Sequence, residues 1–490
     1  MRAVRATDSR WTKADATRTL TAGRSKTSAG EPGATATGAG DAQRRVEKVN
    51  QNNIKPHVPP LRHCANGCVY PTEAKPEEQA LLTIPPIVEA ICRAVADAGG
   101  QAWLVGGVVR DHLLGIATKD FDIEVHSLEA EVLREVLSSI GSVNEVGRSF
   151  GVFKLDSDGI CCDVSIPRHD SQTGESHKDI TVVGNPYMGI EAAARRRDLT
   201  INAIALDPLS GEIADPFGGG RDIERGRLRA VDPKTFVEDP LRAVRVVQFA
   251  ARLGFSVDPK LAELCRQASL WALPPERIWA ELEKMLLRAP TPSIGWTLMD
   301  ELGLIEKVLP DVISLPVGPV SAALDRAAER RDAMMGTGRQ VSLMLSTLLH
   351  QADRTQVDAS LDRLNLHKHH SYPVRKRVLE LTQTWPEVAV EATDTTLRRL
   401  ADHTELALLT EVAAAVSGGT DALRNLDRAV HLGISTDPMP VLLKGKDLTA
   451  LGLVQGPGMG EAMRAVRGAQ IEGEVSDRDG AIIWLKDHLK

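Results

Sequence analysis

The chain has 490 residues, of which 42% are hydrophobic and 26% are charged, and its formal net charge is −7. This charge excludes binding of nucleic acid through overall charge, so any nucleic-acid partner would have to be held by local groups of arginines. No apolar run approaches the ~20 residues that a membrane helix needs, and six cysteines are too few for a disulfide framework in so long a chain. We therefore expect about three domains, no membrane partner, and a location in the reducing cytoplasm.

Residues 1–80 are rich in Ala, Thr, Ser, Gly and Arg and show no sustained hydrophobic period. Because such a segment cannot bury enough apolar surface to offset the entropy of ordering it, we predict a disordered extension. His63, Cys64 and Cys68 have a spacing that could form half of a zinc site, but no second pair follows at ligand spacing. We interpret these three residues as part of a loop.

Between residues 81 and 232, short β-rich runs alternate with helical stretches, which predicts a domain of strands and helices. Its first apolar strand leads to Gly106-Gly107, which opens a helix that carries Arg110 and Asp111. A glycine turn between a strand and a helix offers backbone N–H groups to a phosphate, and Arg110 would add positive charge. This turn is therefore a candidate phosphate-binding site.

The next predicted strand carries two aspartates, Asp120 and Asp122. Because side chains at i and i+2 share one face of a strand, both carboxylates point the same way, while Phe121 and Ile123 point into the core. Two hard oxygen ligands beside a phosphate site suit Mg²⁺. Alone, either half of the pattern would indicate an ordinary turn or a solvated strand; the combination predicts a nucleotide site.

The combination resembles the signature of the polymerase-beta-like nucleotidyltransferase superfamily. In that superfamily a third carboxylate lies on a later strand, and Asp163, within the apolar run 160–166, fits this place. The resemblance implies that Asp120, Asp122 and Asp163 are catalytic, and that Asp120 and Asp122 hold two Mg²⁺ ions. In such a reaction one ion activates an attacking hydroxyl and the other steadies the leaving pyrophosphate.

Further clusters, spread in order over residues 102–310, resemble the class II tRNA nucleotidyltransferases, which comprise the CCA-adding enzymes and their bacterial poly(A) polymerase relatives. Arg197, Asp198 and Asn202 lie in the cluster that resembles the second motif of this family. There the arginines face the triphosphate and the aspartate meets the ribose hydroxyls. A carboxylate that accepts from a 2′-hydroxyl would favour ribonucleotides. Alternatively, arginines at a helix end could complement the helix dipole.

Two other clusters are interpreted as structural. Residues 215–229 resemble the motif that joins the first domain to the next, and most of them are typical turn residues. Residues 275–282 resemble the fifth motif, in which Glu276 and Arg277 would brace the helices that follow.

Asp239, Arg242 and Arg245 lie in the cluster that resembles the fourth motif, at the start of a predicted helical neck over residues 233–310. Asp239 and Arg242 are three residues apart, so one helix face would carry both. A carboxylate acceptor beside a guanidinium donor matches the Watson–Crick edges of cytosine and adenine, whereas uracil and guanine would keep mismatched polar groups that cost ~1–3 kcal/mol each. Arg245 would face the triphosphate. Alternatively, Asp239 only caps the helix and Arg242 is a surface partner.

Residues 311–490 are predicted to form a helical body and tail. Longer relatives often carry a phosphohydrolase domain with a His-Asp pair on a helix, but here His350 is followed by Gln351, which predicts a degenerate domain without that activity. The helices that we expect beyond residue 233 include Pro240–Leu253, Pro275–Arg288, Ala322–Arg331, Val341–Leu349 and Tyr372–Thr384.

Two loop predictions complete this part of the chain. His367, His369 and His370 should lie in a solvated loop between helices. In the tail, residues 443–467 combine lysines, a Pro-Gly helix start and arginines, and the resemblance implies that they grip tRNA.

The sequence thus predicts an α+β protein, with a polymerase-beta-like nucleotidyltransferase head followed by an all-α neck, body and tail. The favoured function is addition of C, C and A to tRNA 3′ ends from CTP and ATP. Poly(A) polymerase is the nearest alternative, and Ser149 disfavours it because it interrupts a doubly basic run typical of those enzymes in residues 146–151. The resemblance implies a flexible loop at residues 167–178, whose full length favours complete addition over CC-only addition, and CC-only or A-only addition is a further alternative. An RNA-binding protein that kept the fold without the chemistry is an alternative from another class.

Overall fold

The computed structural model describes residues 61–63, 69–71, 84–145, 152–157, 159–172, 180–331 and 336–488. These ranges do not include most of the predicted disordered extension, the loop with Cys64 and Cys68, or residues 146–151. Within the extension, β1 (Leu61–His63) and β2 (Val69–Pro71) pair antiparallel, so the prediction of disorder was wrong for these two strands. Their backbone ladder and the contact of β1 with helix α6 (Gly219–Glu224) account for the difference. No helix of the described ranges is both long and apolar enough to span a bilayer.

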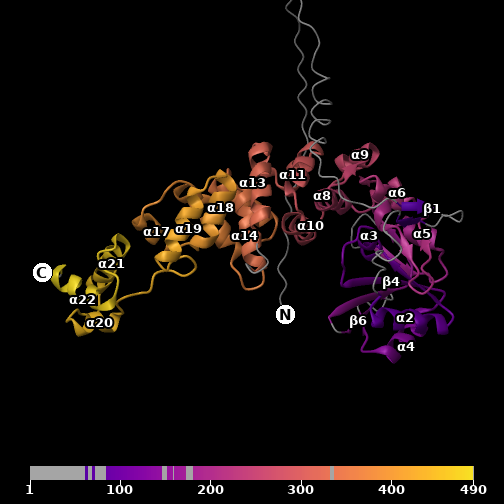
Figure 1. The fold of residues 1–490 in the computed structure, drawn as a ribbon, viewed down its shortest axis with the longest axis horizontal. Coiled ribbons are helices and arrows are strands. Elements are labelled where there is room, and N and C mark those ends of the chain that lie inside the picture. The colour runs from indigo at the N-terminus through magenta and orange to yellow at the C-terminus, as the bar shows by residue number, and fades with distance from the viewer. Residues whose placement is uncertain are drawn as a thin grey trace, which may run out of the picture. The chain divides into compact units, whose positions relative to one another are not determined.

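The head is built on a seven-stranded mixed sheet (Figure 1). β4 and β7 at its centre are parallel, and all other neighbours in this sheet are antiparallel. In spatial order, the strands are β11 (Ile213–Ala214), β10 (Ala205–Leu206), β3 (Gln101–Val105), β4 (Asp120–His126), β7 (Ile160–Ser165), β6 (Val152–Ser157) and β5 (Asn144–Glu145). The parallel pair therefore places the two strands with the predicted carboxylates side by side.

Burial alternates along the first half of β4. Phe121, Ile123 and Val125 are buried in the same core as α2 (Pro86–Asp97) and α4 (Ala130–Ile140), whereas Asp120 and Asp122 are exposed. Burying a side chain such as Phe or Ile stabilises the fold by ~1.5–3 kcal/mol. A slip of one residue would exchange the two faces, so the register is strongly specified. The predicted orientation of Asp120 and Asp122 is confirmed.

Residues 167–178, predicted as a polar loop, are in part a hairpin. β8 (Arg168–Gln172) pairs antiparallel with β9 (Ile180–Gly184). The prediction was wrong for Arg168–Gln172 because the pairing partner lies beyond residue 178, where β-branched residues favour a strand.

Asp222 forms the centre of the junction between head and neck. Its buried carboxylate accepts hydrogen bonds from Thr200 Oγ1 at 2.6 Å, from Arg227 Nη2 at 2.7 Å and from Arg229 Nε at 2.9 Å. Next to it, a Cβ on Gly219 would lie 2.1 Å from the carbonyl oxygen of Thr200, so only glycine fits. This geometry agrees with the structural interpretation of residues 215–229.

Smaller elements of the head and junction are α3 (Gly107–Leu113), α5 (Ile190–Arg195), η1 (Thr200–Asn202), β12 (Arg227–Leu228), α7 (Pro233–Phe236) and β13 (Ser256–Val257), of which β12 and β13 pair in parallel.

Beyond the junction the described chain is almost entirely helical. α10 has the predicted bounds, whereas α16 begins two residues late because Pro373 precedes it, and α13 begins five residues early, where Val320 continues its apolar stripe. The neck and body helices are α8 (Leu241–Leu253), α9 (Pro259–Gln267), α10 (Pro275–Arg288), α11 (Pro292–Glu301), α12 (Leu304–Val308), η2 (Pro310–Val312), α13 (Val317–Arg330), α14 (Thr337–Leu348), α15 (Arg354–Arg363), α16 (Val374–Thr384), η4 (Trp385–Val388), α17 (Asp394–Ala401), α18 (Leu406–Ser417) and α19 (Asp421–His431).

The tail has a small hydrophobic core of its own, separate from the main one. It is formed around α20 (Gly445–Ala450), α21 (Pro457–Glu472) and α22 (Arg478–His488). Arg467 of α21 forms an ion pair with Asp402 at the end of α17, so this arginine ties the tail to the body. The buried residues of this core are Leu443, Leu448, Ala462, Val466, Ala469, Val475, Ala481 and Leu485.

Candidate active site

Three carboxylates lie on the central strands of the head. In the parallel register of β4 and β7, Asp122 is paired with Asp163. Lys154 of β6 donates to both oxygens of Asp163, at 2.9 Å each. Within the described chain, no side chain forms a hydrogen bond or ion pair with the carboxylate of Asp120 or Asp122. Both carboxylates are therefore available to a cation, and their role as metal ligands stays a prediction.

The electrostatics of this face fit a bound cation. Desolvation by the surrounding protein raises the pKa of Asp122, and Asp163 and Asp120 raise it further against the lowering effect of Arg197. A cation would relieve this repulsion. Two neighbouring carboxylates suit Mg²⁺, since this ion usually takes one or two carboxylates and completes its shell with water and phosphate oxygens.

The glycine turn lies directly beside these carboxylates. Gly106 has φ +77°, a conformation that side-chain-bearing residues rarely adopt, and α3 begins at Gly107. A Cβ on Gly106 would come within 2.9 Å of Arg197 Nη1 and 3.5 Å of Asp122 Oδ2. The turn, Arg197 of the second motif and Asp122 therefore meet at one place, although they are far apart in the sequence.

Glu124 is a member of this site that the sequence analysis missed. It is 4% exposed, and its carboxylate lies 3.2 Å from Arg196 Nη2, 3.8 Å from Arg197 Nη2 and 3.3 Å from His126 Nε2. Although burial opposes it, the hydrogen bond from His126 and the two arginines lower the pKa of Glu124 to about 2. The sequence did contain a signal for Glu124: it lies two residues after Asp122, so it shares the strand face of Asp120 and Asp122.

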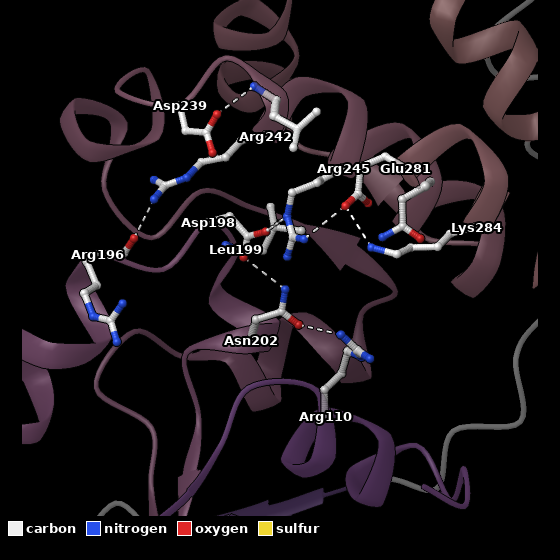
Figure 2. A network of polar contacts seen from close by, with 12 residues as sticks. Arg110, Arg196, Asp198, Leu199, Asn202, Asp239, Arg242, Arg245, Glu281 and Lys284 are labelled. Atoms are coloured by element: carbon white, nitrogen blue, oxygen red, sulfur yellow. Dashed lines mark hydrogen bonds and ion pairs between the residues drawn. The ribbon is translucent and has the colours of Figure 1, made fainter. Parts of the chain in front are cut away.

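Arg110 is turned toward the neck rather than open to solvent beside the glycine turn. It is 5% exposed, and its guanidinium donates to Asp111 Oδ1 at 2.7 Å. It also donates to Asn202 Oδ1 at 2.6 Å (Figure 2). It also lies over the ring of Phe249 in α8, 5.0 Å from the ring centroid. In this structure Arg110 therefore joins the first and second motifs and does not stand free as a phosphate ligand.

Asp198 lies at the centre of the network in Figure 2. Its Oδ1 accepts from the backbone N–H of Leu199 at 2.8 Å and from Asn202 Nδ2 at 3.0 Å. Its Oδ2 accepts from Arg245 Nε at 2.7 Å. Burial opposes ionisation, but Arg245 and these hydrogen bonds outweigh it and lower the pKa of Asp198. The predicted ribose residue and the predicted triphosphate residue Arg245 thus contact each other here.

Asp239 and Arg242, predicted as neighbours on one helix face, do not pair. α8 begins at Leu241, so Asp239 precedes the helix, and its Oδ1 accepts from the Leu241 backbone N–H at 3.1 Å. Its Oδ2 accepts from Arg277 Nη2 at 2.8 Å. Arg242 donates to the carbonyl oxygens of Thr235 and Arg196, at 2.7 Å each. The N-cap of α8 is Pro240, so the alternative with Asp239 as the N-cap and Pro240 as the first helical residue was wrong, although Asp239 accepts from the first backbone N–H of the helix. Arg242 is not a free surface arginine, and Arg277 contacts the start of the neck through Asp239.

Two histidines of the body contact other residues of the chain. His350 is buried, with its Nδ1 2.8 Å from the carbonyl oxygen of Thr347 and its ring against Trp385. The Nε2 of His369 lies 3.0 Å from Glu283 of α10. The prediction of a solvated loop was therefore wrong for His369, since a residue 86 positions away in the sequence holds it.

Comparisons with known proteins agree with this geometry. The family described as "Poly A polymerase head domain" matches residues 102–229, and the one described as "Probable RNA and SrmB- binding site of polymerase A" matches residues 254–315. A CCA-adding enzyme of Marinobacter nauticus is 30% identical over 387 residues, which cover 76% of this chain and 98% of that protein. A multifunctional CCA protein of Xanthomonas campestris pv. campestris is 36% identical over 222 residues, 44% of this chain. The chain matches only 52% of the length of that multifunctional protein.

Solved structures have the same fold. The CCA-adding enzyme of Bacillus stearothermophilus, crystallised with CTP, has a TM-score of 0.66 and 25% identity, covering 82% of this chain and 98% of that one. The Thermotoga maritima CCA-adding enzyme, complexed with tRNA, has a TM-score of 0.61 and 20% identity, covering 84% of this chain and 98% of that one.

Proposed function

Since this chain belongs to the family of the CCA-adding enzymes, and is thus an RNA nucleotidyltransferase, we propose that it adds C, C and A to the 3′ ends of tRNA from CTP and ATP. The observation that carries the proposal is the meeting of Asp122, Asp163 and the Gly106 turn on one face of the head. The named activity of a relative with 30% identity over 98% of its own length supports it. The reducing cytoplasm, where the described cysteines stay free thiols, is its proposed compartment.

Asp120 and Asp122 would hold two Mg²⁺ ions, because their carboxylates share one exposed face of β4. When bound, such ions lower the pKa of an attacking 3′-hydroxyl and neutralise charge on the leaving pyrophosphate. Asp163 would join this face once the Lys154 ammonium moves off its two oxygens.

The nucleotide would be held by groups that already surround this face. The backbone N–H groups at Gly106 and Gly107, together with Arg197, would bind the triphosphate. Asp198 would accept from the ribose hydroxyls. Four residues would support these groups: Arg110, Asp111, Asn202 and Arg245. Asp111 contacts Arg110, and Figure 2 shows the contacts of Asn202 with Arg110 and Asp198 and of Arg245 with Asp198.

Base selection would belong to Asp239 and Arg242 at the start of α8. Each is fixed by its own partner, Asp239 by Arg277 and Arg242 by two carbonyl oxygens. Groups fixed in this way lose little entropy when a base binds, so a mismatched base meets unpaired donors and acceptors that cannot adapt.

The test incubates the purified full chain and its Asp120→Ala variant with tRNA that ends at the discriminator base, Mg²⁺, and CTP or ATP singly or together. Product length is read on a sequencing gel. Three added residues that need both nucleotides, and that the variant does not add, are the expected result.

Other products would overturn the proposal in distinct ways. Long adenosine tails would identify a poly(A) polymerase, and arrest after two cytidines a CC-adding enzyme. Extension only of tRNA that already ends in CC would identify an A-adding enzyme. Binding of tRNA without any extension would identify an RNA-binding protein that has kept the fold.

A further inference from the structure

The carboxylate of Asp198 has little hydrogen-bonding capacity left. Each carboxylate oxygen can accept about two hydrogen bonds. Oδ1 already accepts from Leu199 and Asn202, and Oδ2 accepts from Arg245 Nε at 2.7 Å. A ribose hydroxyl therefore has one acceptor position to use, the second one on Oδ2.

Arg245 is the group that could take this position. A guanidinium carries its N–H donors in one plane, so Nε and the neighbouring Nη2 can both donate to one carboxylate. Here Arg245 gives Asp198 only Nε, while Nη1 lies 3.4 Å from Glu281 Oε1 of α10 (Figure 2). Within the described residues, Nη2 bonds to neither carboxylate. Asp198 therefore holds the guanidinium at Nε and Glu281 holds it at Nη1, and these two contacts fix its orientation.

Stability alone does not account for Glu281. Its side chain is 4% exposed, Oε1 also accepts from Lys284 Nζ at 2.9 Å, and Oε2 has no hydrogen-bond partner among the described residues. A buried carboxylate oxygen without a partner destabilises the folded state. Retaining an acid here is explained if its charge orients Arg245.

We infer that Glu281 is a positioning residue for sugar selection: by holding Nη1 of Arg245, it keeps the last acceptor position of Asp198 open for the ribose 2′-hydroxyl. Without its charge, the guanidinium can turn until Nη2 also donates to Oδ2 of Asp198, at the position that the 2′-hydroxyl would use. The 2′-hydroxyl then loses its acceptor, whereas a deoxyribonucleotide loses nothing. The inference rests on the proposed function, in which Asp198 meets the ribose.

The test measures binding of CTP and of dCTP to the full chain by titration calorimetry with Mg²⁺ and without tRNA, for wild type and Glu281→Gln. Glutamine keeps the size and removes the charge. The CTP/dCTP affinity ratio should fall about tenfold, through weaker binding of CTP and not of dCTP. A merely structural defect would weaken both nucleotides equally, and that outcome would overturn the inference.

Two further variants sharpen the result. Glu276→Gln changes an exposed acid on the same helix, which contacts Asn365, and should leave the ratio unchanged. The double variant Glu281→Gln/Arg245→Lys should regain much of the ratio, because an ammonium has no second nitrogen that could donate to Oδ2. If Glu281→Gln does not fold, Glu281→Asp decides the matter, because it keeps the charge but shortens the side chain: a lower CTP/dCTP ratio with unchanged dCTP binding supports the inference, and an unchanged ratio contradicts it.

Asp198→Asn separates the inference from its premise. If this variant keeps the wild-type CTP/dCTP ratio, the ribose role of Asp198 is wrong and the inference fails with it. If Asp198→Asn lowers the ratio and Glu281→Gln does not, only the inference fails. Absence of tRNA extension by wild type would refute the proposed function and leave this binding test intact.

Discussion

Two groups of aspartates in this molecule meet opposite conditions. On the sheet face, the carboxylates of Asp120 and Asp122 are exposed and have no side-chain partner within the described chain. At the junction of head and neck, Asp198 and Asp222 are buried, and their oxygens accept hydrogen bonds from arginines, an amide, a hydroxyl or a backbone N–H.

The difference shows how the same residue type serves two purposes. A carboxylate left without partners remains available for a cation from solution, and its repulsion with neighbouring acids is a cost that ligand binding removes. A buried carboxylate with several partners holds other groups in place, and removing it would leave buried charges uncompensated. Substitutions on the sheet face should therefore change activity alone, whereas substitutions at the junction should also change stability.

The largest effect is expected from Asp120→Ala. Nucleotide incorporation into tRNA should fall at least about 1000-fold, since a metal ligand is lost, while the melting temperature stays the same or rises. Incorporation assays and thermal unfolding measure the two quantities. Glu131→Ala, an exposed acid on α4, is the control and should change neither. A clear drop in melting temperature for Asp120→Ala would break the contrast between the two groups.

Asp222→Ala should show the opposite behaviour. Because it leaves Thr200, Arg227 and Arg229 without their common acceptor, the free energy of unfolding should fall by ~3–5 kcal/mol. Urea unfolding provides the measurement. Glu263→Ala, which breaks an exposed ion pair with Arg266, should cost less than ~1 kcal/mol. Equal losses for the two variants would mean that the junction carboxylate is not specially important.

Glu124→Gln lies between the two cases, since Glu124 is buried like the junction acids but holds the predicted triphosphate arginine. The KM for CTP and ATP should rise about tenfold with a smaller change in kcat, because Arg196 and Arg197 lose a charge-assisted contact. Steady-state kinetics decide the point. A loss confined to kcat would instead assign Glu124 to the chemical step.

The smallest effect is expected from Lys154→Met. Its ammonium competes with any cation for Asp163, so the Mg²⁺ concentration for half-maximal incorporation should fall about threefold. A magnesium titration of activity measures this shift. Lys260→Met at the start of α9 should leave the midpoint unchanged, and a rise in the midpoint for Lys154→Met would show that Lys154 assists the metal site.

The sequence predicted those parts of the site that depend on local spacing. The strand parity of Asp120 and Asp122 and the bounds of α10 follow from neighbours a few residues away. Contacts between distant residues could not be predicted in this way. Arg110 and Asn202 are 92 positions apart, and Arg245 and Glu281 are 36 apart.

The prediction that Asp239 and Arg242 are neighbours on one helix face failed for a different reason. Their spacing of three residues indicates a helical pair only if both lie within the helix. Because α8 begins at Leu241, Asp239 remains outside it and binds the Leu241 N–H and Arg277 instead.

The separate core of the tail has a consequence for the motions of the chain. Eight buried residues hold α20, α21 and α22 together without joining the main core. Such a unit can open locally at a free-energy cost below that of global unfolding. Amide hydrogens of α21 should therefore exchange with solvent deuterium earlier than those of α8 or α18, and the C-terminal helices behave as a cooperative folding unit in their own right.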